Sequence, residues 1–538
     1  MQLRPFISAA EELAIACQSA NPDWAKLSRK ILQQSDRLSP TQISIILNSL
    51  AKNPSDAQRQ LVHALTKSAE AQANDFKPFQ IGLIVNACSK LGFNNTRLLK
   101  AFADKATIYF NSSHPINHQT VALTFSGLYK LNLADKKFQV SVVSRMKKIV
   151  ATNPSSLSPH DAAAILHAFA QTPTLAPGAY SLIPKLFETA AESSSVEHCI
   201  VGLLGLAHLK RPPEISDERL EQAIGRVETD IGRLSFVQLA NAAFAVATVA
   251  SGKRSLTFLE KVSNASKPLL ESPGIKNSSL ILMISGFGKS SDSRFGPLLF
   301  ELARRLHGES LRPDGAATVL NALSKHNVDY LDYFDLERSI AELNGATSGS
   351  SIDSETNEKL GQTASLILVG LVRADRLDAA LHFLESTVSE PLIRGMSDQS
   401  LVNCAHALAT LKILHVEAQR NFQVIDRQLV RMIDRLTGST RLPTEALNQL
   451  GTVAIVCSLT NLVDELRMDS LRWLKDCAIS AYRSMPQPPP SSLHRQVAES
   501  IGEFGMEGHV DIRKDRLHHE VRVGPFFVDI VLDAVGSP

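Results

Sequence analysis

Apolar residues recur along most of the chain at the spacing of one face of an α-helix. The segment 38–50, LSPTQISIILNSL, returns with the same pattern at 76–88, 116–128 and 157–169. Looser copies follow at 194–206, 234–246, 275–287, 311–323, 359–371, 396–408 and 441–453. We take the third residue of each copy as position one, so that position one of the first copy is Pro40. Self-similarity at steps of 36 to 48 residues over eleven copies indicates a helical repeat array.

Four positions of the repeat explain why each copy should form a helix that packs on its neighbours. Positions four, eight and eleven are apolar in every copy, beginning with Ile43, Leu47 and Leu50. Offsets of zero, four and seven lie on one helical face. Position ten is small in every copy, as at Ser49 and Gly127. A small residue at one fixed place lets the backbones of adjacent helices approach closely.

A second amphipathic helix is predicted after the first in many units, as at 56–73, 96–110, 136–151, 255–270 and 417–436. A hairpin of this size cannot bury its apolar face alone, so successive hairpins stack and share a core. The sequence therefore predicts an all-α fold, a right-handed α-solenoid of about eleven helical hairpins over residues 38–484. Residues 1–37 are predicted to form a helical cap.

The pattern changes at the C-terminal end. Residues 485–490, MPQPPP, predict a stiff proline-rich linker. A short helix is expected from Ser491 to about Phe504, and the period then falls to two at 518–523 and 526–532. Residues 491–538 are therefore predicted to be a small and incomplete α/β module that stops soon after its second strand.

Residues of this module carry a family resemblance. A helix with Leu493, Val497 and Ile501, a strand with Glu520 and the run 528–532, VDIVL, together resemble the start of a RAP domain. The repeat unit also resembles those of organellar RNA-binding proteins that carry this domain, namely the FAST-kinase-like, octotricopeptide and heptatricopeptide families. The resemblance implies RNA binding in an organelle, most often the mitochondrial matrix. It implies contact with ribosomal RNA as a component or assembly factor of the mitochondrial ribosome, with other ribonucleoprotein proteins as partners, or a role in messenger RNA processing or stability.

The same resemblance bears on catalysis. RAP domains resemble the restriction-endonuclease fold, and by that analogy Glu520 and Asp529 match acidic positions of a nuclease core. A metal-dependent nuclease also needs a second acid and a lysine on the following strand. The sequence ends before that strand, so we expect Glu520 and Asp529 to belong to a binding module rather than an enzyme.

Other motifs narrow the function classes. No run approaches the roughly 18 apolar residues needed to cross a bilayer. The six cysteines lack metal-ligand or CxxC spacing and are expected to be buried free thiols. No phosphate-loop, dinucleotide, nucleophile-elbow or HExxH motif occurs, and the sixteen histidines are scattered. We therefore expect no enzymatic activity, no cofactor and no metal site.

Charge is unevenly distributed along the chain. The net charge is +2, yet residues 76–150 hold eleven lysines and arginines against Asp104 and Asp135. Several cations on one surface neutralise phosphates, so we expect candidate RNA phosphate-binding residues here: Lys77, Lys90, Arg97, Lys100, Lys105, Lys130, Lys136, Lys137, Arg145, Lys147 and Lys148. A second stripe comprises Arg427, Arg431 and Arg435, with Asp426 and Asp434 nearby.

Base recognition by a repeat protein requires a recurring polar position on one face. Position nine lies beside the apolar stripe and supplies candidate base-reading residues: Asn48, Asn86, Ser126, His167, Ser285, Asn321 and His406. Leu204, Phe244 and Val369 at the same position argue against a uniform code. Position three is also polar in most copies, as is ordinary for a first helical turn.

Two interpretations remain open. In the first the chain is an organellar RNA-binding solenoid. In the second it is a protein–protein scaffold of the armadillo or HEAT type without nucleic acid, which predicts that the basic segment is dispersed or offset by acids of adjacent repeats. The N-terminus lacks the long, arginine-rich and acid-poor pattern of a transit peptide, so import requires either a leader outside this numbering or another signal.

Overall fold

The computed structural model describes most of the repeat array and a C-terminal strand pair. Described are residues 14–484, apart from 20–22, 53–58, 173, 210–213, 291, 329–334, 348–353, 415–421, 440–441, 461 and 463–464, together with 517–523 and 526–532. The array is all-α, and its helices pack sequentially as in a solenoid. It divides into two compact units, residues 1–290 and 291–538. The handedness of the array stays a prediction.

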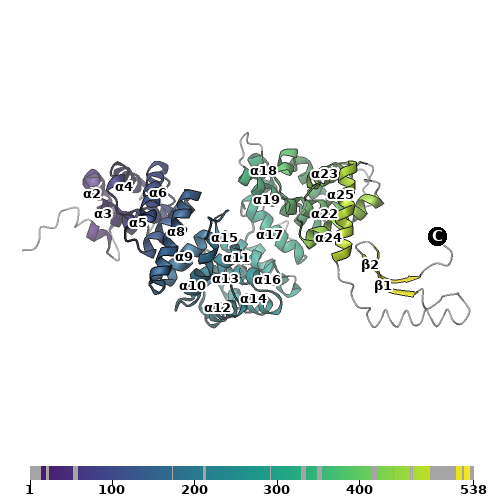
Figure 1. The fold of residues 1–538 in the computed structure, drawn as a ribbon, viewed down its shortest axis with the longest axis horizontal. Coiled ribbons are helices and arrows are strands. Elements are labelled where there is room, and N and C mark those ends of the chain that lie inside the picture. The colour runs from purple at the N-terminus through teal and green to yellow at the C-terminus, as the bar shows by residue number, and fades with distance from the viewer. Residues whose placement is uncertain are drawn as a thin grey trace, which may run out of the picture. The chain divides into compact units, whose positions relative to one another are not determined.

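In the first unit, one helix per repeat begins at or next to position one; we call these the A helices. They are α3 (Pro40–Leu50), α5 (Pro78–Leu91), α7 (His118–Lys130), α9 (Pro159–Ala170), α11 (Val196–His208), α13 (Phe236–Val249) and α15 (Asn277–Phe287). Each A helix packs against the next A helix along the chain, as Figure 1 allows the reader to follow. The predicted stacking of repeats is confirmed within this unit.

Second helices, the B helices, alternate with these. They are α2 (Trp24–Gln34) in the cap region, α4 (Arg59–Ala71), α6 (Thr96–Asn111), α8 (Lys136–Thr152), α10 (Ile183–Ala191), α12 (Asp217–Asp230) and α14 (Gly252–Ser266). The observed bounds of α6 and α8 lie within one residue of the predicted ones, while α14 begins and ends earlier than predicted.

The second unit repeats this plan with less regular connections. Its A helices are α17 (Pro313–Lys325), α19 (Ser354–Arg373), α22 (Asp398–Leu414) and α24 (Thr444–Leu459). The remaining helices are α16 (Gly296–Arg304), α18 (Leu336–Thr347), α20 (Leu377–Ser386), α21 (Glu390–Gly395), α23 (Phe422–Leu436) and α25 (Met468–Ser484). Helix α19 starts seven residues before position one of its copy, so the inserted sequence before it has lengthened the A helix.

The core follows the predicted positions. Positions four, eight and eleven are buried in all eleven copies, for example Ile81, Val85 and Cys88 on α5. These side chains contribute to the apolar area that each hairpin removes from water, which is the main favourable term in its folding. The three-position stripe is therefore part of the core in every copy.

Helix starts are fixed by capping. Ser39 and Gln42 form a reciprocal capping box at the start of α3, and Ser235 and Gln238 form another at α13. Gln80 reaches back in the same way to the backbone N–H of Lys77 at 2.8 Å. Such caps satisfy backbone donors that a helix N-terminus leaves unpaired. The polar residue at position three is thus a capping residue in these repeats.

Close approach at position ten is confirmed by the glycines there. A Cβ added to Gly286 on α15 would lie 2.8 Å from the backbone nitrogen of Phe244 on α13. A Cβ on Gly127 of α7 would lie 3.0 Å from the carbonyl carbon of Val85 on α5. Position ten therefore faces the preceding A helix, and its small size sets the spacing between repeats.

All six cysteines are free and buried, which confirms their predicted state. Burial raises the pKa of Cys88 and Cys404 to about 12 and that of Cys17 and Cys477 to about 11. Because only the thiolate is reactive, we expect native protein to resist Ellman's reagent at pH 8 and to release six equivalents of thiol in denaturant. Rapid labelling of the native chain would contradict the burial.

At the C-terminal end, β1 (Leu517–Val523) and β2 (Phe526–Leu532) form an antiparallel pair, with Leu517 opposite Leu532 and Val523 opposite Phe526. Glu520 lies between the paired residues His519 and Val521, and Asp529 lies between their partners. The predicted linker and the helix before the strands fall outside the described residues. A strand pair alone does not make an α/β module, so that module stays a prediction.

Candidate functional site

Position nine lies half-buried at the edge of the core. Its side chains are partly exposed in every copy except those of Leu204 and Gly451, which are buried. One turn further along each A helix, position thirteen lies on the same side, because residues four apart share a helical face. This position is exposed wherever it carries lysine, arginine or histidine: Lys52, Lys90, Lys130, His208, Lys289, Lys325 and Arg373.

The recurrence of cations at position thirteen was missed by the sequence analysis, which counted charges along the chain rather than by repeat position. The signal was present, because Lys or Arg occupies this position in six of the eleven copies. It also brings in Lys289 and Arg373, which lie far from the basic segment 76–150.

Side chains at positions nine and thirteen interact from one A helix to the next. Burial lowers the pKa of Lys130 at the end of α7, and the positive charge of Lys90 at the end of α5 lowers it further. His167 on α9 lies near both Lys130 and His208, with 6.4 Å between the two imidazole ring centres. Two predicted phosphate-binding lysines and one predicted base-reading residue thus come together.

The interactions continue to the last A helix of the first unit. The ring of His208 lies 5.4 Å from that of Phe244 on α13, and the ammonium of Lys289 lies 5.1 Å from the Phe244 ring centre. We call the continuous set Lys90, Lys130, His167, His208, Phe244 and Lys289 the A-helix row. It crosses six successive repeats and combines cations, imidazoles and an aromatic face.

The second unit has a shorter set at the same positions. The guanidinium of Arg373 donates to the side-chain oxygen of Asn321 at 2.8 Å, which joins position thirteen of α19 to position nine of α17. Burial lowers the pKa of His406 on α22, and the charge of Arg373 lowers it further. Two predicted base-reading residues, Asn321 and His406, therefore lie around one arginine.

The row also predicts an acid sensitivity. Burial, and then the charges of His208 and Lys130, lower the pKa of His167 to about 4. The unfolded chain therefore binds more protons between about pH 6.5 and 4, so the free energy of unfolding falls as the pH drops through that window. We expect His167→Gln to lose less stability than the parent between pH 7 and 5 in urea titrations, whereas the exposed His382→Gln should match the parent. Equal losses in all three would contradict this assignment.

Position three plays a different part. The amide of Gln80 donates to the hydroxyl of Thr41 at 2.9 Å, and His118 Nδ1 lies 2.6 Å from a carboxylate oxygen of Asp161. These contacts join the first turns of neighbouring A helices. They are inter-repeat contacts and caps, so position three is used by the fold.

The basic segment does not form one surface. Arg97 on α6 pairs with Glu70 on α4 at 3.1 Å, and Lys105 donates to the backbone carbonyl of Asn74. Arg145 is only 7% exposed. Lys100, Lys136, Lys137 and Lys147 lie exposed on the B helices α6 and α8, away from the A-helix row.

Arg145 differs from the other cations of the segment. Its terminal Nη2 donates to the carbonyls of Tyr109 and Ser112 at 3.2 Å each and to that of His114 at 2.6 Å. Through these three hydrogen bonds from Nη2, Arg145 holds the α6–α7 connection in place. Its predicted role as an RNA phosphate-binding residue stays a prediction.

The second arginine stripe lies on α23. Arg427 and Arg435 are exposed, whereas Arg431 lies 3.8 Å from Glu390. Asp426 pairs with the buried Lys412, and Asp434 lies 3.6 Å from Arg467. Both neighbouring aspartates are thus bound to other cations, and the stripe stays partly offset by Glu390.

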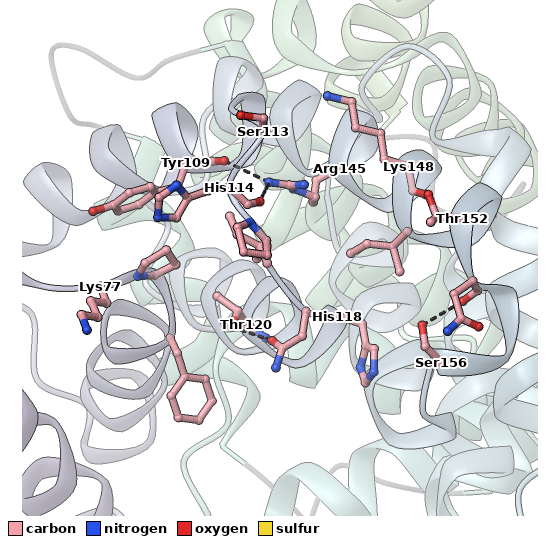
Figure 2. Close-up of a pocket in the computed structure, with 17 residues that line it drawn as sticks. Lys77, Tyr109, Ser113, His114, His118, Thr120, Arg145, Lys148, Thr152 and Ser156 are labelled. Carbon is pink, nitrogen blue, oxygen red and sulfur yellow. Dashed lines mark hydrogen bonds between the residues drawn. The ribbon is translucent and has the colours of Figure 1, made fainter.

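A cleft of about 850 Å³ opens at the other end of α5 and α7, between their first turns, the end of α6 and the end of α8. Figure 2 shows Lys77 and Lys148 on opposite sides of it, and Arg145 turned toward the loop of Tyr109 and His114. Its lining residues are Lys77, Pro78, Phe79, Tyr109, Ser113, His114, Pro115, Ile116, Asn117, His118, Thr120, Arg145, Lys148, Ile149, Thr152, Asn153 and Ser156.

The described residues were also compared with what a metal site and a membrane span require. Within the described residues, no cluster of histidine, cysteine or carboxylate side chains has the grouping of a metal site. No helix in the same part of the chain combines the length and the apolar character needed to cross a membrane.

Comparisons with known proteins do not assign the chain to a family. No family model matches the sequence, and no curated protein matches it. Among solved structures the chain is similar to a chain of the homology model of the full-length AP-3 complex in an intermediate open conformation. The identity is 12% and the TM-score 0.29, with 88% of this chain and 92% of that chain covered.

Proposed function

We propose that this chain is an RNA-binding helical-repeat protein and that single-stranded RNA lies along the A-helix row. The observation that carries the proposal is the position-thirteen lysine or arginine, which recurs in six of the eleven copies beside a half-buried position nine. Such a cation is suited to a phosphate backbone, and an aromatic or imidazole ring is suited to a base.

The pair Lys90 and Lys130 strengthens the argument. The charge of Lys90 disfavours the charged form of Lys130, which is also partly desolvated, and neither lysine forms an ion pair with a described carboxylate. A phosphate between them would relieve the repulsion and be bound more tightly for that reason. An arrangement that is unfavourable in the free protein and favourable with a polyanion supports a binding surface.

The neutral imidazole of His167 fits the same proposal. Its pKa near 4 leaves it uncharged at physiological pH, and a neutral imidazole has one donor and one acceptor nitrogen. The Nδ1 of His167 is buried, so Nε2 is the nitrogen that could form a hydrogen bond to a base edge while the flanking lysines neutralise phosphates. The buried Leu204 at the same position of the next repeat limits direct base contact to some repeats.

The RNA we propose is an organellar ribosomal RNA in the mitochondrial matrix. This part of the proposal rests on the resemblance of the repeat unit and of the C-terminal sequence to organellar RNA-binding proteins. In this role the chain is a component or an assembly factor of the mitochondrial ribosome, with ribonucleoprotein proteins as neighbours.

Crosslinking in cells tests the proposal. The tagged protein is crosslinked to RNA, trimmed with nuclease, purified at two salt concentrations and sequenced for RNA. We expect discrete segments of organellar ribosomal RNA, crosslinked to peptides that contain Lys90, Lys130 or Phe244. Recovery of background RNA alone, with stoichiometric protein partners, would overturn it.

The scaffold interpretation has support of its own. Cations on the B helices are often offset by acids of adjacent repeats, as in Arg97 with Glu70 and Arg254 with Glu221 and Glu228. A scaffold without nucleic acid predicts that the A-helix row binds an acidic protein segment instead. The same crosslinking experiment separates the two, because only the scaffold yields protein crosslinks to the row without RNA.

A further inference from the structure

We infer that the cleft between α5, α6, α7 and α8 binds a nucleotide, with Lys77 and Lys148 as the cations around it and Phe79 at the base. This site goes beyond the proposed function, because it lies at the opposite end of α5 and α7 from Lys90 and Lys130. It is wholly contained within the first unit.

The charge of the cleft points to an anion. Lys77 and Lys148 line it on opposite sides (Figure 2), and none of the described residues that line it is an aspartate or glutamate. Neither lysine forms an ion pair with a described carboxylate. A cleft that is lined by cations and lacks acids has a positive potential and therefore attracts anions such as phosphate.

The remaining lining points to more than free phosphate. Phe79 is 42% exposed although it is a large apolar side chain on a helix that buries most others. An exposed aromatic face beside cations suits stacking of a base whose phosphate is neutralised nearby. Ser113, Asn117, Asn153 and Ser156 line the same space and provide donors and acceptors for a sugar or a base edge.

The size and rigidity of the cleft agree with a bound small molecule. A volume of about 850 Å³ lies in the range of ligand pockets, roughly 300 to 1,000 Å³. The three carbonyls held by Arg145 fix the wall formed by residues 109–114. A preformed wall spares the binding step the entropy of ordering a loop. An acidic peptide would contact the lysines, but its carboxylates would not account for the exposed aromatic ring.

The nucleotide has two sources, a free nucleotide or one residue of an RNA chain. Fluorescence anisotropy on the full chain tests both, with labelled adenosine monophosphate as one probe and a labelled single-stranded RNA oligonucleotide as the other. The cleft variants are Phe79→Ala and the pair Lys77→Gln with Lys148→Gln. The matched control is Lys253→Gln with Lys267→Gln, which removes the same charge from exposed sites within and just after α14.

We expect the cleft variants to weaken adenosine monophosphate binding by about tenfold or more, as the loss of charge-assisted contacts predicts, while the control matches the parent. If only the RNA probe responds, the nucleotide belongs to an RNA chain. If neither probe responds to the cleft variants, or a polyglutamate peptide displaces adenosine monophosphate as well as unlabelled nucleotide does, the inference is wrong.

The outcome for the proposed function is read separately. If the cleft variants leave both probes unchanged while Lys90→Gln with Lys130→Gln weakens RNA binding, the cleft inference fails and the A-helix row stands. If the cleft variants weaken nucleotide binding but the Lys90 and Lys130 variants bind RNA like the parent, the cleft inference stands and the proposal for the A-helix row fails.

Discussion

Replacing Lys90 and Lys130 together by glutamine is expected to lower the affinity for single-stranded RNA by about tenfold or more near 0.15 M salt. The two ammonium groups end neighbouring A helices, and the charge of Lys90 lowers the pKa of Lys130. A phosphate bound there would interact with two ammonium groups at once. The binding constant is measured by fluorescence anisotropy at several salt concentrations.

The salt dependence gives a second readout. For single strands each neutralised phosphate contributes about 0.7 to the slope of log affinity against log salt. Loss of two contacts should therefore reduce the steepness of that slope by roughly 1.4. A change in affinity without a change in slope indicates damage to the fold or to base contacts, and the A-helix row would then not be the phosphate path.

Two controls make this result specific. Lys136→Gln with Lys137→Gln removes the same charge from the exposed start of α8 and is expected to change affinity by less than about twofold. Stability supplies the other control. Because the Lys90–Lys130 repulsion is lost, the double glutamine variant should unfold at the same or a higher urea concentration than the parent. Equal loss of affinity in both pairs would show that only overall charge attracts RNA.

Much of the fold was predictable because the repeat restates the same physical requirement in every copy. Ile43, Leu47 and Leu50 could each belong to many structures, but the same spacing at eleven places fits only a stacked helical face. The start of α5 at Pro78 and of α9 at Pro159 follows from the restricted backbone of proline in a first turn. The capping role of position three at Gln42 and Gln238 follows from the same local rules.

The site was harder to predict, since it depends on which repeats place their cations beside one another. The basic segment 76–150 was defined by the number of charges along the chain. Many of these charges lie on α6 and α8, away from the A helices. Arg145 illustrates the limit. Its charge suggests a phosphate ligand. Only the folded structure shows that its Nη2 donates hydrogen bonds to the carbonyls of Tyr109, Ser112 and His114.

The contacts between repeats were also not predicted by the assumption that one residue per repeat reads one base. Leu204 is buried at position nine, and in that repeat His208 at position thirteen lies between His167 and Phe244. The surface is therefore continuous although no single position is uniform. Columns taken one at a time cannot show this, because neighbouring helices combine positions nine and thirteen.

Gly286→Val is expected to destabilise the first unit by about 3 kcal/mol or more. Gly286 is at position ten of α15, and an added Cβ would lie 2.8 Å from the backbone nitrogen of Phe244 and 2.9 Å from the carbonyl carbon of Ala243. Backbone atoms cannot turn aside as a flexible side chain can, so α15 must move away from α13. Urea unfolding measures the loss as a lower midpoint.

The matched control is a helical glycine with free space around it. Gly225 lies inside α12, and an added Cβ there meets no atom within 4 Å. Gly225→Ala should therefore stabilise the chain by somewhat less than about 1 kcal/mol, since alanine is the better helix former. If Gly286→Val and Gly225→Ala were equally harmless, position ten would not set the repeat spacing. If Gly286→Val moves α15 away from α13 as expected, the Lys289 ammonium should also leave the Phe244 ring. RNA affinity should then fall together with stability.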